Sequence, residues 1–90
     1  MDTPYSIDSI EAEAQEEEKR ARTLRFLTDV LFQRLHLESM SLIEAREAVA
    51  ELRRTALVLF PGKGDVFDLV IAPRMERVIT ERWGERWGSN

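Results

Sequence analysis

Few residues of this 90-residue chain have the types and spacing that catalysis requires. The only histidine, His36, lies near Glu38, whereas a metal site needs about three or four ligands on facing elements. There is no cysteine, which excludes disulfides, thiolate nucleophiles and cysteine-based zinc sites. Asp29 lies in a leucine-rich stretch and is interpreted as a surface or interface acid. We therefore predict no catalytic residue, no metal site and no cofactor, and a protein that is not an enzyme.

The segment Pro61-Gly62-Lys63-Gly64-Asp65 contains glycines and a lysine but lacks the spacing of a phosphate-binding loop. That pattern has about four residues between its glycines, followed by lysine and a hydroxyl residue, after a buried strand. Here the lysine lies between the glycines, and a helix is predicted before them. We interpret the segment as a turn.

Charge is unevenly distributed along the chain, whose net charge is −4. Residues 1–18 carry seven acidic residues and no basic one, and the remainder has an excess of bases, mostly arginine. Arginines in residues 19–25, 53–54 and 74–86 support an alternative function as a nucleic-acid-associated accessory protein. Nucleic acid is nevertheless an unlikely partner, because these arginines alternate with glutamates in a pattern typical of a solvated, ion-paired face.

A long first helix is predicted over residues 9–37, after a flexible arm at residues 1–8. Asp8 with Glu11 resembles a capping box, and neither glycine nor proline interrupts the segment. Residues 9–18 leave two alternatives open, a helical extension that meets a partner and a frayed acidic end.

A second helix is predicted over residues 42–59, antiparallel to the first because the connection is short. Ser41 and Glu44 form a capping box at its start. Phe60 precedes a proline and Gly62 follows, which predicts the helix end.

The third helix is predicted over residues 66–84, with a kink at Pro73. The alternative makes residues 66–71 a strand, which would have two unpaired edges in a single chain. We therefore predict an all-α fold, a three-helix bundle in which a long N-terminal helix is followed by a helical hairpin, with residues 9–87 as one domain.

Each of the first two helices carries two apolar stripes, whereas a helix of a small bundle usually needs one. In the first helix Leu24, Leu27, Leu31 and Leu35 form one stripe, and the second stripe lies roughly 140° away. At the carboxyl end Arg-Trp-Gly occurs twice, and these residue types are common in interface hot spots. The candidate partner-binding residues are Phe26, Val30, Leu37, Ile43, Leu57, Trp83 and Trp87.

These stripes predict a small helical protein that self-associates, with a dimer favoured, or that docks on a partner protein. The chain has no apolar run of the roughly 18–20 residues that span a bilayer, so no membrane partner is predicted. Its amino terminus lacks the apolar core of a secretory signal, and a cytoplasmic location is expected.

Overall fold

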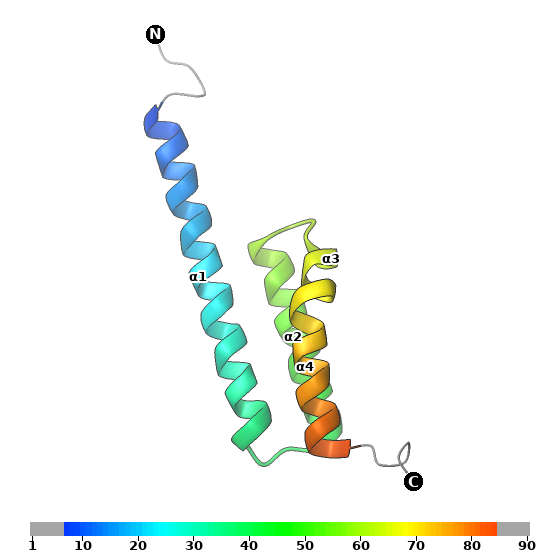
Figure 1. The fold of residues 1–90 in the computed structure, drawn as a ribbon. Helices are drawn as coiled ribbons and strands as arrows, with labels where there is room; N and C mark the ends of the chain where they lie inside the picture. The colour runs from blue at the N-terminus through cyan, green and yellow to red at the C-terminus, as the bar shows by residue number, and fades with distance from the viewer. Residues whose placement is uncertain (1–6, 85–90) are drawn as a thin grey trace.

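The computed structural model describes residues 7–84, which form three helices in contact with one another and no strand (Figure 1). The all-α prediction is therefore confirmed, and the strand alternative for residues 66–71 is wrong. The elements in chain order are α1 (Ile7–Leu37), α2 (Leu42–Leu59), α3 (Gly64–Val66), η1 (Phe67–Ile71), α4 (Ala72–Ile79) and η2 (Thr80–Gly84). The last four follow one another without a break and make up the third helix.

Helix α1 begins earlier than the sequence predicted. Ile7 and Asp8 are helical rather than part of an arm, and Asp8 lies in the first turn rather than at the cap. An acid in that position is still favourable, because it interacts with the positive end of the helix dipole. Residues 9–18 are helical throughout, as the first alternative requires of their backbone.

The limits of α2 match the prediction at both ends. The Ser41 hydroxyl accepts a hydrogen bond from the Glu44 amide at 3.0 Å, and the Glu44 carboxylate accepts one from the Ser41 amide at 2.9 Å. These bonds satisfy amides that lack a partner within the helix. The helix ends before Pro61, and Gly62 adopts a φ of +83°, which strains residues that carry a Cβ.

The third helix begins at Gly64, two residues before the predicted start, and it contains a wide π-helical turn just before Pro73. The Ala72 amide donates to the carbonyl of Phe67, five residues earlier. Proline has no amide hydrogen, and its ring would clash with the carbonyl four residues earlier in a regular α-helix. A π-turn is a known way to absorb such a defect, so the predicted kink takes the form of this widened turn.

The core lies where the three helices meet. Leu31 and Leu35 of α1 pack with the buried residues of α2 and with apolar residues of the third helix. Leu24 and Leu27 are half-buried against the same cluster. The buried apolar residues are Leu31, Leu35, Ala45, Leu52, Ala56, Phe67, Met75, Val78 and Ile79.

Helix α1 is much longer than its neighbours. Its 31 residues correspond to a length of about 46 Å, against about 27 Å for the 18 residues of α2. The amino-terminal part of α1 therefore extends beyond the loop between α2 and α3 and diverges from them (Figure 1). Residues 7–18, termed the projecting end, are exposed apart from a half-buried Ser9.

Candidate interaction surfaces

Three of the predicted contact residues, Phe26, Val30 and Leu37, lie together on α1 and line a shallow groove. We term them the outer strip. The Phe26 side chain is 66% exposed and that of Leu37 is 77% exposed. These side chains therefore leave apolar surface in contact with water in the folded chain, as expected for a second apolar stripe that the core does not need.

The other predicted contact residues lie apart from the outer strip. Ile43 on α2 is 70% exposed. Leu57 is half-buried, and its Cδ2 lies 3.4 Å from the position that a Cβ on Gly64 would occupy, so the start of the third helix partly covers it. Trp83 is half-buried against the core, and Trp87 lies outside the described residues.

The sequence analysis missed an exposed apolar group at the start of the third helix. Val70 follows the helical spacing of Phe67, Ile71 and Met75, which predicts that it lies with them on the apolar face of a regular helix, yet it is 58% exposed. The π-turn of η1 is the physical reason, because an extra residue in a turn rotates the following side chains relative to a regular helix. Pro73 was the only feature of the sequence that indicated this π-turn. The exposed residues of this group are Val66, Leu69 and Val70.

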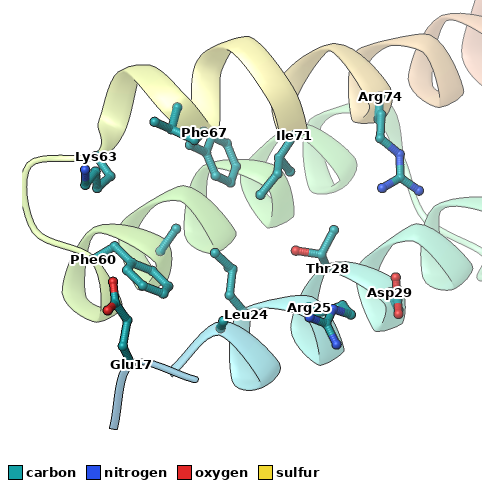
Figure 2. Close-up of a pocket in the computed structure, with 13 residues that line it drawn as sticks. Glu17, Leu24, Arg25, Thr28, Asp29, Phe60, Lys63, Phe67, Ile71 and Arg74 are labelled. Carbon is teal, nitrogen blue, oxygen red and sulfur yellow. The ribbon is translucent and has the colours of Figure 1, made fainter. Parts of the chain in front are cut away.

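A cleft of about 510 Å³ lies at the point where α1 diverges from the other helices (Figure 2). Leu24 lines it from α1, facing Phe60 at the end of α2 and Phe67 and Ile71 on the third helix. Charged groups also line it: the cations Arg25, Lys63 and Arg74 and the carboxylates Glu17 and Asp29. The cleft thus combines an apolar interior with charged groups.

Two polar atoms close to the cleft are buried without a hydrogen-bond partner. One is the hydroxyl oxygen of Thr28, a cleft residue that is only 5% exposed. The other is Nε of Arg20, about two turns of α1 before Thr28. Leaving a buried polar group unpaired is unfavourable, so a partner that supplies complementary groups would be stabilised here.

Several arginines predicted to form a solvated face make ion pairs within the chain. Arg46 of α2 donates two hydrogen bonds to Glu76 of α4, at 2.8 and 3.0 Å. Arg53 forms a similar pair with Asp68, at the same two distances. The pKa of Glu76 and that of Asp68 lie below their ordinary values because each carboxylate accepts hydrogen bonds from its arginine. These pairs connect α2 to the third helix.

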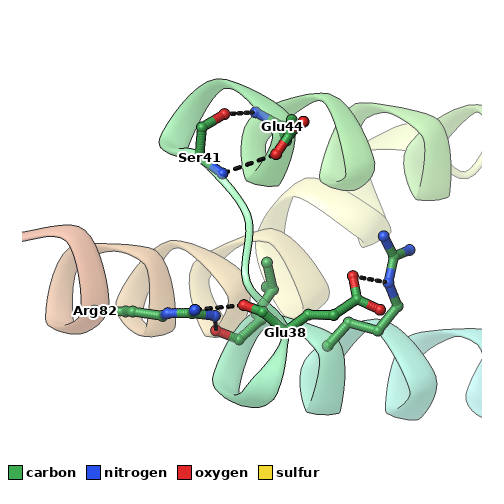
Figure 3. Close-up of polar contacts among 6 residues, drawn as sticks. Glu38, Ser41, Glu44 and Arg82 are labelled. Atoms are coloured by element: carbon green, nitrogen blue, oxygen red, sulfur yellow. Dashed lines mark hydrogen bonds and ion pairs between the residues drawn. The ribbon is translucent and has the colours of Figure 1, made fainter.

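Arg82 was expected on the same solvated face, but it reaches across to the end of α1 (Figure 3). Its Nη1 donates to the carbonyl of Leu35 at 2.6 Å, and its Nη2 donates to the carbonyl of Glu38. The final carbonyls of a helix lack partners within it and carry the negative end of its dipole. Arg82 therefore acts as a cap supplied by another helix.

Among residues 7–84 there is no group of histidine and carboxylate side chains that could hold a metal ion. Over the same residues, no helix is long and apolar enough to cross a membrane. Comparison with known proteins gives no match: no family model, no curated protein and no solved structure is significantly similar to this chain.

Proposed function

We propose that this protein is a non-enzymatic helical module whose function is association, first of all with a second copy of itself and secondarily with another protein. The observation that carries the proposal is the amount of apolar surface that the described chain leaves exposed, including Phe26, Leu37 and Ile43 at 66–77% exposure. Isolated exposed apolar residues are common, but grouped ones mark interaction sites.

The arrangement of the helices supports this proposal. A short chain has difficulty in burying enough surface to be stable alone, and here residues 7–18 of the longest helix are exposed apart from a half-buried Ser9. Forming a dimer would cover this surface and add stability. Phe26, Val30, Leu37 and Ile43 remain the candidate contacts with a different protein, because they are exposed and lie on helices that the core holds in place.

The alternative as a nucleic-acid accessory protein has less support. Arg46, Arg53 and Arg54 are each paired with a carboxylate, which reduces the positive potential that phosphate binding requires. Arg82 donates to backbone carbonyls. We therefore propose protein association alone.

Thermal unfolding at several protein concentrations tests the proposal. If folding is coupled to dimer formation, the midpoint temperature rises with concentration, because dilution favours dissociated chains. For two chains of this length we expect a rise of about 4 °C for each tenfold increase in concentration. A midpoint that stays constant from micromolar to near-millimolar concentration would contradict self-association.

A further inference from the structure

The stripe of α1 that faces the core continues along the projecting end. Ile7, Ile10, Ala14, Glu17, Ala21 and Leu24 are spaced alternately three and four residues apart, and Thr28, Leu31 and Leu35 continue the spacing into the core. Such spacing places side chains on one side of a helix, as in a coiled coil. The projecting end therefore presents a helix-packing face that no other described segment of the chain covers.

The cleft lies at the base of this uncovered face. Its walls are Leu24 on α1 and Phe60, Phe67 and Ile71 on the opposite side (Figure 2). The cleft and the projecting end thus share one α1 face, and a helix that packs along this face would reach the mouth of the cleft with its tip.

The charges on the cleft favour an acidic occupant. Arg25, Lys63 and Arg74 line it together with Glu17 and Asp29, and Lys19 and Arg20 lie on the nearby turns of α1, so that cations outnumber carboxylates there. The projecting end has the complementary composition, since residues 7–18 contain six acidic residues and no basic one. An acidic amphipathic helix is therefore the occupant that fits, and each copy of the chain carries one.

One of the two unpaired polar atoms agrees with this occupant. Arg20 Nε, buried and unpaired, can donate to a carboxylate of an incoming acidic helix. A purely apolar occupant would leave this Nε unsatisfied.

The projecting end cannot occupy the cleft of its own chain, because α1 is one uninterrupted helix from Ile7 to Leu37. The occupant must then come from another molecule. If two copies exchange their projecting ends in antiparallel orientation, both clefts are filled by the same contact, and the assembly closes as a two-fold dimer.

We propose that the cleft of each copy binds the projecting end of a second copy, in an antiparallel pairing of the two α1 helices. This inference rests on the proposed self-association and specifies its surface. The spacing of the stripe sets the register: Ile7 of one copy packs beside Leu24 of the other, Ile10 beside Ala21, and Ala14 beside Glu17. In this register Glu13 approaches Arg20, the residue with the buried, unpaired Nε, and on the other side of the seam Glu11 lies near Glu18 of the other copy.

Disulfide trapping in the full-length chain tests this register, and the absence of native cysteine makes single-cysteine variants unambiguous. Two chains of distinguishable mass, one with Ile10→Cys and the other with Ala21→Cys, are mixed and oxidised. We expect the mixed dimer to form at least about tenfold faster than the disulfide of either variant alone, because pairing raises the local concentration of the two thiols. Circular dichroism of each variant checks that it is folded.

A matched control pairs the same Ile10→Cys chain with Phe26→Cys, which lies on the outer strip. We expect slow trapping in this mixture. The proposal would be overturned if Ile10→Cys formed a disulfide as fast with Phe26→Cys as with Ala21→Cys. It would also be overturned if Ala21→Cys formed a disulfide rapidly with itself, as a parallel pairing would allow. If the wild-type chain is dimeric but the cysteine variants lack the predicted trapping pattern, this register is overturned while self-association stands.

Discussion

At the residue scale, Arg82 shows how one side chain stabilises a helix distant in the sequence. Its guanidinium donates to carbonyls at the end of α1, which are 44 and 47 residues away along the chain. A planar group with several donors can satisfy two carbonyls at once, and its charge interacts favourably with the helix dipole. Sequence analysis placed Arg82 on a solvated face, because helical periodicity indicates the direction of a side chain but not which distant backbone groups it meets.

Arg82→Ala is expected to reduce the free energy of unfolding by about 1–3 kcal/mol, since it removes charge-assisted hydrogen bonds to two carbonyls. Arg82→Lys should have an intermediate effect, because lysine keeps the charge but lacks the planar fork of donors. Urea denaturation followed by circular dichroism measures both. Arg77→Ala, an exposed arginine of α4, serves as the control and should change stability by less than about 0.5 kcal/mol. Equal effects at Arg77 and Arg82 would contradict the capping role.

At the element scale, local signals in the sequence determine most helix limits. Ser41 and Glu44 set the start of α2, and Pro61 sets its end, so this helix could be predicted in full. The π-turn of η1 could not, because a periodicity of about 3.6 residues per turn assumes a regular helix. For the same reason the exposure of Val70 was missed. Proline indicates that a helix is disturbed, but the way the disturbance is absorbed depends on packing with α1 and α2.

The ion pair between Arg46 and Glu76, which connects α2 to α4, makes a pH-dependent contribution to stability. The pKa of Glu76 lies below its ordinary value of 4.5, because its carboxylate accepts hydrogen bonds from Arg46 and this effect exceeds the opposing effect of burial. A lowered pKa in the folded state means that the contribution is complete above pH 4.5 and is lost as the pH falls through the folded value.

Glu76→Gln should therefore reduce stability at pH 7 by about 0.2–1 kcal/mol, the range for exposed ion pairs, and by less at about pH 3. Denaturation midpoints of the variant and the wild type at the two pH values measure this difference. Arg46→Gln removes the other partner and should give the same pattern. A stability loss that is as large at acidic pH as at neutral pH would show that the ion pair is not its cause.

At the scale of the whole molecule, the mismatch in helix length is the main structural feature. The sequence predicted a first helix longer than its neighbours and correctly located the exposed Phe26, Val30, Leu37 and Ile43, because these residues fall outside the core stripes. It did not predict the cleft. The cleft walls come from two segments far apart in the chain, and their separation depends on the angle at which α1 diverges from the hairpin, which no local pattern encodes.

The same mismatch explains why association is the proposed function. The carboxyl-terminal part of one stripe of α1 forms the core with Leu31 and Leu35, and its amino-terminal part is covered by no other segment of residues 7–84. Apolar side chains such as Ile7 and Ile10 in water lose the stabilisation that burial gives. A second copy supplies a helix with matching spacing and an acidic surface that complements the cations of the cleft.

Sedimentation equilibrium of the unmodified chain, from micromolar to near-millimolar concentration, tests self-association most directly. Self-association predicts a mass that approaches 21 kDa, twice the 10.5 kDa of one chain, as the concentration rises. A single species of 10.5 kDa, fully helical at every concentration, would contradict it.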